Sequence, residues 1–113
     1  MTVSDARVVR RHLDAVLALD TQAMVADYAP DAVLARPDRV WCGPDAIRAY
    51  FTTVPERLGG GRVEFTAVDE AQLEVRWRIV GGPGDGTCGR DRYVVRDGLI
   101  SRQTVVIASD ADF

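Results

Sequence analysis

Residues 43–51 read Gly43-Pro44-Asp45-Ala46-Ile47-Arg48-Ala49-Tyr50-Phe51. A proline and an acid directly after a glycine favour a helix start, because the first amides of a helix need no intrahelical partner and the helix dipole favours negative charge there. Ile47, Tyr50 and Phe51 recur at helical spacing and share one apolar face. The segment therefore predicts a helix over residues 44–53 that buries this face.

Two further helices are predicted before this segment. Near the start of the chain, apolar residues form one broad helical stripe, which also contains His12 and comprises Val8, Val9, Leu13, Val16, Leu17 and Leu19. A second, short helix is expected from residue 20 or 21, with Met24, Val25 and Tyr28 directed inward, and Pro30 should end it. Residues 32–36 are then expected to form a strand, and residues 40–42 a short extended piece.

A different periodicity follows Gly59-Gly60-Gly61. Apolar residues at 63, 65 and 67, and again at 73, 75, 77 and 79, alternate with polar ones, which is typical of antiparallel strands with one buried face. The glycine-rich stretch 81–86 predicts a loop between strands, and Asp97-Gly98 is typical of a two-residue hairpin turn. The last strand is expected to reach about Ile107, with residues 108–113 as a loose tail.

The predicted order is three helices with a short strand among them, followed by four strands. This order indicates an α+β fold with helices on one face of a curved sheet. The 113 residues fit one domain.

The composition narrows the classes of function. The 17 acidic and 14 basic residues give a net charge of −3, which argues against nucleic-acid binding through phosphate contacts. No uncharged stretch is long enough to span a membrane, and charges within the first 20 residues argue against a secretory signal. One histidine and two cysteines argue against a disulfide framework and against a metal site built from these residues. We therefore expect a cytoplasmic protein with no metal.

Four segments resemble the nuclear transport factor 2-like superfamily, which includes ketosteroid isomerases, limonene epoxide hydrolases and SnoaL-like polyketide cyclases. They are Val8-Val9-Arg10-Arg11-His12-Leu13, Tyr28-Ala29-Pro30-Asp31-Ala32-Val33, residues 43–51 as quoted above, and Asp97-Gly98-Leu99-Ile100. The resemblance covers residues 8 to 107. It implies a cone, in which a strongly curved antiparallel sheet wraps around the helices and leaves an apolar pocket with a few polar groups at the open end. It also implies chemistry without a cofactor and a homodimer formed through the sheet face.

The resemblance further marks three positions. In ketosteroid isomerases a carboxylate base works with an oxyanion hole made of a tyrosine and a protonated aspartic acid. By motif, the tyrosine position is His12, the aspartic acid is Asp91, and the base position is Arg36. Because a cation replaces the base, steroid isomerisation by the family mechanism is not expected. Epoxide hydrolysis is not expected either, since the Asp-Arg-Asp set is missing and its later aspartate falls near Val105.

The residues themselves leave two interpretations of these positions open. His12 is either a hydrogen-bonded core histidine or an imidazole that a carboxylate orients for proton transfer near neutral pH. Asp91 shares a strand face with Tyr93, so a carboxylate there needs a partner, unless it is a solvated strand residue. Arg36 either faces solvent at a strand end or points inward, where it would keep Asp91 ionised or bind an anionic group. Gln103 is the one amide on its strand face.

The leading hypothesis is an enzyme that performs cofactor-free proton transfer, such as isomerisation or cyclisation, on a small and largely apolar carbonyl compound. His12 and Asp91 would form the acid/base pair, and the expected ligand contacts are Tyr28, Arg36, Trp41, Tyr93 and Gln103. The alternative is a non-catalytic ligand-binding or dimerisation domain of the same fold, in which His12 and Asp91 do not approach a shared cavity.

Overall fold

The computed structural model of the protein describes residues 4–108. Helix α1 (Asp5–Leu17) begins after Ser4, whose side chain accepts a hydrogen bond from the amide of Arg7 and caps the helix. The predicted stripe is buried at Val8, Val9, His12 and Leu13, but it ends earlier than expected, because Leu17 and Leu19 at the end of the helix are exposed (56% and 44%).

Three shorter helices follow, so residues 4–108 contain one helix more than the sequence predicted. They are α2 (Thr21–Ala26), α3 (Pro44–Thr52) and α4 (Val54–Leu58). The α4 helix was missed because Pro55 reads as a helix breaker, although proline is tolerated in the first turn. Tyr28 was assigned to α2 but belongs to the next strand, where its side chain is nevertheless buried.

The six strands are β1 (Tyr28–Arg36), β2 (Arg39–Cys42), β3 (Arg62–Asp69), β4 (Glu74–Val80), β5 (Cys88–Arg96) and β6 (Leu99–Ala108). They form one sheet in the order β2-β1-β6-β5-β4-β3. Neighbouring strands are antiparallel except β1 and β6, which run parallel. The predicted β5–β6 turn is confirmed, since Asp97 and Gly98 both have positive φ (55° and 77°), as a type I′ hairpin requires.

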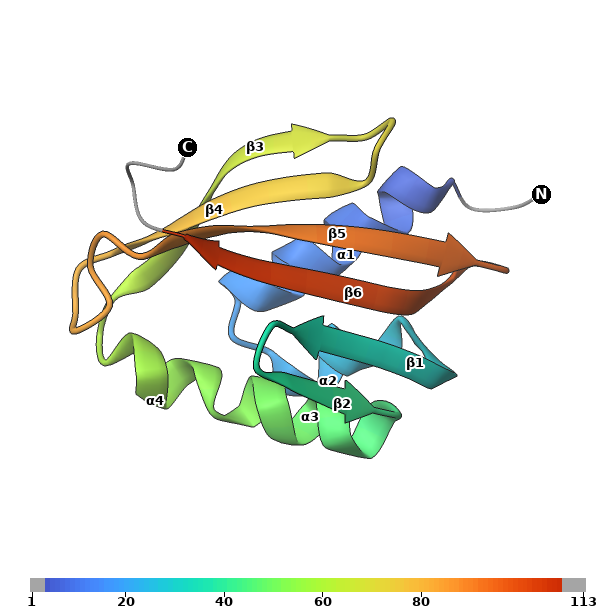
Figure 1. Cartoon of the computed structure of the whole chain (residues 1–113), viewed down its shortest axis with the longest axis horizontal. Coiled ribbons are helices and arrows are strands. Elements are labelled where there is room, and N and C mark those ends of the chain that lie inside the picture. The colour runs from blue at the N-terminus through green and yellow to red at the C-terminus, as the bar shows by residue number, and fades with distance from the viewer. Residues whose placement is uncertain (1–3, 109–113) are drawn as a thin grey trace.

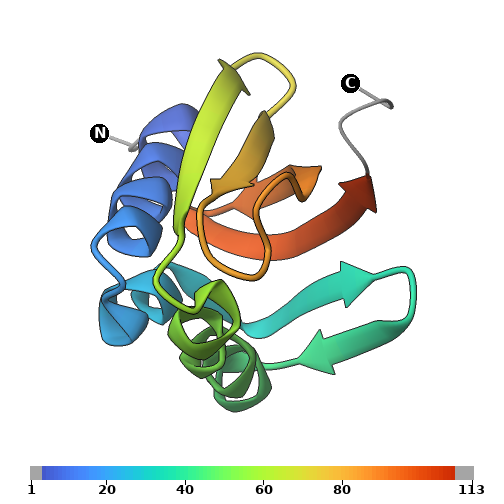
Figure 2. The same cartoon turned by 90° about the vertical axis from the view of Figure 1, so that its left-hand side faces the viewer.

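The sheet curls around the helices, and this curvature creates the room for a site (Figures 1 and 2). Register shifts in the β1–β6, β3–β4 and β5–β6 pairs sharpen the local twist. Helix α1 packs on β5 and β6, while α3 packs on β1 and β2. The predicted class, an α+β fold with helices against a curved sheet, is therefore confirmed.

The end of the last strand departs slightly from the prediction. Ala108, which was placed in the tail, closes β6, and residues 109–113 lie outside the described residues. Among the helices of residues 4–108, none combines the length and the apolar character that crossing a membrane requires.

Candidate active site

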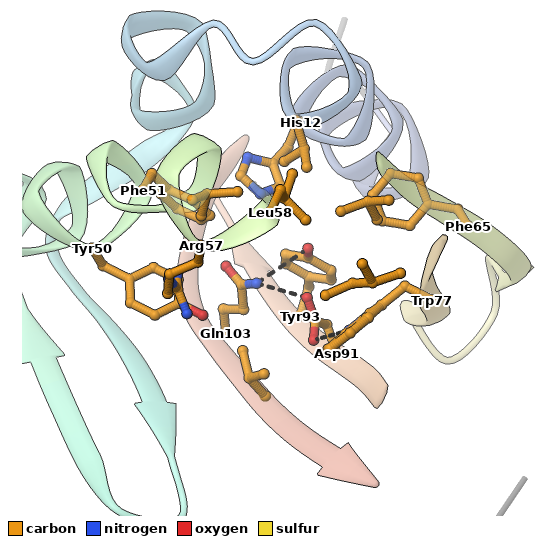
Figure 3. Close-up of a pocket in the computed structure, with 15 residues that line it drawn as sticks. His12, Tyr50, Phe51, Arg57, Leu58, Phe65, Trp77, Asp91, Tyr93 and Gln103 are labelled. Atoms are coloured by element: carbon orange, nitrogen blue, oxygen red, sulfur yellow. Dashed lines mark hydrogen bonds between the residues drawn. The ribbon is translucent and has the colours of Figure 1, made fainter. Parts of the chain in front are cut away.

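A cavity of about 120 Å³ lies between the helices and the concave face of strands β3 to β6 (Figure 3). Most of its lining is apolar and comes from Val16, Phe51, Val54, Leu58, Val63, Phe65, Ile79 and Val105. The buried polar side chains that reach it are His12 from α1, Asp91 and Tyr93 from β5, and Gln103 from β6. An apolar cavity with a few convergent polar groups is the arrangement expected of a small-molecule site.

Asp91 is surrounded by hydrogen-bond donors. Its Oδ1 accepts from the indole Nε1 of Trp77 at 3.0 Å, and its Oδ2 accepts from the amide Nε2 of Gln103 at 2.9 Å. The indole N–H can only donate, so it favours an acceptor at Oδ1. These neighbours therefore suit the ionised carboxylate better than the neutral acid.

Burial opposes this preference. Loss of water raises the pKa of Asp91 from 3.8 to about 6, although hydrogen bonds from Trp77, Gln103 and Tyr93, together with the charge of Arg36, lower it. The carboxylate is consequently mostly ionised at neutral pH and is a stronger base than an aspartate in water. A base with a pKa near the operating pH is what general base catalysis favours.

The Trp77 contact depends on a glycine in the neighbouring strand. Trp77 and Gly89 are register partners in β4 and β5, and a Cβ added to Gly89 would lie 2.4 Å from a carbon of the indole ring. The missing side chain thus lets the indole lie across β5 and reach Asp91, two residues further on. The sequence pattern placed Trp77 only among the apolar positions of a strand, and the glycine opposite it is the signal that could have revealed its role.

His12 is fully buried and is oriented by the backbone. Its Nδ1 lies 2.9 Å from the carbonyl oxygen of Met24, and because a carbonyl only accepts, Nδ1 carries a proton. Burial lowers the pKa of His12 from 6.5 to about 4, so the imidazole is neutral at neutral pH and Nε2 is left as an acceptor. The carbonyl of Met24 therefore orients this ring, whereas the sequence hypothesis gave that role to a carboxylate.

Two side chains link His12 to Asp91. The Tyr28 hydroxyl lies 3.4 Å from Nε2 of His12 and donates a hydrogen bond to Oε1 of Gln103. The other end of the Gln103 amide donates to Asp91 and contacts the hydroxyl of Tyr93 at 3.3 Å. The side-chain amide of Gln103 does not readily release a proton, so this series of hydrogen bonds does not carry a proton between His12 and Asp91. It holds the two side chains in position instead.

Both tyrosines of this network stay protonated. Burial raises the pKa of Tyr28 and of Tyr93 well above 10, and the nearby charge of Asp91 raises them further. Each therefore keeps an O–H donor across the physiological range. The structure thus brings His12, Asp91, Tyr93 and Gln103 to one cavity, with Tyr28 directly behind them.

Two expected ligand contacts lie elsewhere. Arg36 ends β1 outside the cavity lining, with its Nε 3.6 Å from a carboxylate oxygen of Asp38, and it acts on Asp91 only through its charge. Trp41 packs against Tyr50, with ring centroids 4.7 Å apart, and is not part of the lining either. Within residues 4–108, no group of three His, Cys, Asp or Glu side chains is arranged to hold a metal ion.

The family model of the SnoaL-like domain matches residues 9–103. The chain therefore belongs to this family of the nuclear transport factor 2-like superfamily, which confirms the resemblance noted in the sequence. No curated protein matches the chain significantly.

Solved structures share the fold over most of the chain. A protein from Sinorhizobium meliloti, proposed to be a polyketide cyclase, is 25% identical, with a TM-score of 0.73 over 88% of this chain and 93% of its own. A protein from Kribbella flavida, proposed to be a ketosteroid isomerase, is 19% identical, with a TM-score of 0.79 over 92% and 77%. An NTF2-like protein of unknown function from Mesorhizobium loti is 20% identical, with a TM-score of 0.79 over 92% and 90%. The two likenesses below 25% identity concern the fold alone.

Proposed function

We propose that this protein catalyses cofactor-free proton transfer at a carbon beside the carbonyl group of a small, largely apolar compound, in an isomerisation or a cyclisation. The observation that carries the proposal is Asp91, a buried carboxylate with a pKa of about 6 at the wall of an apolar cavity. The similarity to a protein from S. meliloti proposed to be a polyketide cyclase supports the same class of chemistry.

Each polar residue then has a defined task. Asp91 takes the proton from carbon and returns it to another carbon in an isomerisation, or to the oxygen of the attacked carbonyl in a cyclisation, so one carboxylate serves both steps. The Tyr93 hydroxyl lies in the cavity wall beside Gln103 and donates to Asp91 in the free protein, and we propose that it turns to donate to the carbonyl oxygen as negative charge develops there. His12 is neutral and has no proton on Nε2, so we assign it ligand contact through an acceptor atom and no longer the role of acid.

The test follows the exchange of carbon-bound protons. Cyclohexanone and 3-cyclohexen-1-one are incubated with the protein in D₂O, and proton NMR records deuterium uptake and migration of the double bond. Asp91→Asn should slow both processes by about 10²–10⁴-fold, the usual contribution of a general base. Asp31→Asn is the control, since Asp31 is exposed on β1 and outside the cavity lining, and it should leave the rates unchanged. Equal rates in Asp91→Asn and the wild type would refute the proposal.

The alternative, a non-catalytic ligand-binding or dimerisation domain, is favoured by one observation. Both carboxylate oxygens of Asp91 already have donors, as a purely structural buried carboxylate also requires. In that case the cyclic ketones bind to the cavity, but their protons exchange no faster than in buffer.

We further propose that the protein is cytoplasmic, because two cysteines are too few for a disulfide framework, and that it forms a homodimer through the outer sheet face. That face has a hollow lined by Glu74, Arg90, Arg92, Thr104 and Val106, in which Glu74 and Arg92 pair with each other at 2.9 Å and Val106 offers an apolar contact to a second copy. Sedimentation velocity tests the dimer. Val106→Arg should shift the protein toward monomer, whereas an unchanged sedimentation coefficient in this variant would contradict the assignment of the face.

A further inference from the structure

Arg57 brings a positive charge to the cavity lining. It lies on α4 and is exposed, and its guanidinium group stands 4.8 Å from the centre of the Tyr50 ring, which also lines the cavity. Figure 3 shows these two side chains together on one side of the cavity, with Asp91 and Trp77 on the other. The cavity therefore has a cationic side and an anionic side.

The charge of Arg57 is available to a ligand. Arg62 and Arg78 both pair with Glu64 at 2.9 Å, whereas Arg57 forms no ion pair with the described residues 4–108. The Tyr50 ring holds the guanidinium in place by a cation–π contact and leaves its N–H donors unoccupied, and such a fork is suited to a carboxylate.

The volume of the cavity limits the size of what it encloses. An apolar protein cavity of about 150 Å³ holds one benzene molecule. The 120 Å³ here is somewhat smaller and is partly open to solvent, so the cavity takes in most of one six-membered ring or a short aliphatic chain, while a fused polycyclic ligand would extend far into solvent.

We propose that the ligand is a small organic carboxylate with a single ring or a short chain as its apolar part, and that Arg57 binds its carboxylate. The inference rests on the proposed function of the cavity and specifies its substrate class as oxo acids of this size. Asp91 repels a second carboxylate, so the carboxylate of the ligand turns toward Arg57 and the ring enters between Phe51 and Phe65. Attraction of the ligand carboxylate by Arg57 and its repulsion by Asp91 fix one orientation of the ligand. In this orientation the carbon that loses its proton faces Asp91.

The experiment compares benzoate with benzamide, which has the same ring but no charge, by isothermal titration calorimetry on the full chain. The wild type should bind benzoate at least about tenfold more tightly, as expected for one charge-assisted hydrogen-bonded pair. Arg57→Met should remove this preference and leave benzamide binding unchanged. Arg48→Met, an exposed change on α3 outside the lining, should leave both affinities unchanged.

Several outcomes would overturn the proposal: equal affinities in the wild type, equal weakening of both probes by Arg57→Met, the same loss in Arg48→Met, or no binding of either probe. The experiments distinguish a failure of the carboxylate proposal from a failure of the proposed proton transfer. Exchange that depends on Asp91 without a benzoate preference overturns only the carboxylate assignment. A benzoate preference that depends on Arg57 without exchange overturns only the proton transfer.

Discussion

The opposite pKa shifts of Asp91 and His12 make a quantitative prediction about stability and pH. Asp91 has a pKa of about 6 in the folded chain against 3.8 in its ordinary state. Between these values the folded state holds a proton that the unfolded state has lost, so stability falls as the pH rises. At about 1.4 kcal/mol per pKa unit, this shift amounts to about 3 kcal/mol in total, of which about 2 kcal/mol is lost between pH 4 and 6.

His12 acts in the other direction over nearly the same range. Its pKa is about 4 when folded and 6.5 in its ordinary state, so between these values the unfolded chain binds the extra proton. Stability therefore rises with pH, again by about 3 kcal/mol between pH 4 and 6.5. In the wild type the two contributions nearly cancel, and neither is visible alone.

Substitution of either group should uncover the other. Urea unfolding of wild type, Asp91→Asn and His12→Asn is followed by tryptophan fluorescence between pH 4 and 7. Relative to the wild type, the stability of Asp91→Asn should rise by about 2 kcal/mol between pH 4 and 6, because this difference contains only the aspartate contribution that the variant has lost. Relative to the wild type, the stability of His12→Asn should fall by about 2 kcal/mol between pH 4 and 6, because this difference contains only the histidine contribution that the variant has lost. Differences from the wild type remove the contributions of all other titrating groups.

Both variants keep the local hydrogen bonds. In Asp91→Asn, the Gln103 amide can turn over, so that its oxygen accepts from the new amide and its nitrogen donates to Tyr28. In His12→Asn, the new amide nitrogen replaces Nδ1 as the donor to the Met24 carbonyl. Stability differences that stay constant from pH 4 to 7 would refute the buried titration of these two groups.

Three further substitutions test the supports of the site. Trp77→Phe removes one donor from Asp91, so the pKa of Asp91 should rise by about one unit, measured by carbon NMR of the labelled carboxyl; no rise would exclude the indole as a determinant. Gly89→Ala places a Cβ 2.4 Å from the Trp77 ring and should lower the unfolding free energy in urea by about 2 kcal/mol or more, whereas an unchanged value would mean that the ring moves freely. Arg11→Met leaves the buried Asp27 carboxylate, now paired at 2.7 Å, without its cation, and should cost about 1–3 kcal/mol in the same measurement; a loss below about 0.5 kcal/mol would place this pair with ordinary surface pairs.

The elements predicted correctly are those with a strong local signal. The strands between Val63 and Ile79 follow from a period-two alternation of apolar and polar side chains. The Asp97-Gly98 turn follows from two residue types that tolerate positive φ. Both signals can be recognised in the sequence. The start of β1 was missed because Pro30 was interpreted as the end of a helix. The strand tolerates this proline at the irregular stretch between Tyr28 and Val33, where the register with β6 shifts.

Within the candidate site, periodicity was sufficient for residues whose face follows from their own strand or helix. Asp91 and Tyr93 share one face of β5, Gln103 lies on β6 and His12 lies in the stripe of α1, so periodicity singled out all four, although it left open whether Asp91 faces solvent. Arg57 was missed because its helix was not predicted. Trp41, which was expected to contact a ligand, lies outside the cavity lining and packs against Tyr50, a contact between β2 and α3 that periodicity within one strand does not reveal.

The basicity of Asp91 arises from two opposing effects that separate parts of the fold supply. Burial between the helices and the sheet raises its pKa, and donors from β4, β5 and β6 lower it again to about 6. Burial without these donors would keep the group neutral and remove the base, while donors without burial would keep it a weak base as in water. The indole donor in turn requires a residue without a side chain in the neighbouring strand. A pKa suited to proton transfer is thus a consequence of how Gly89 and Trp77 pack, which explains why the aspartate could be found from its strand but its chemistry could not.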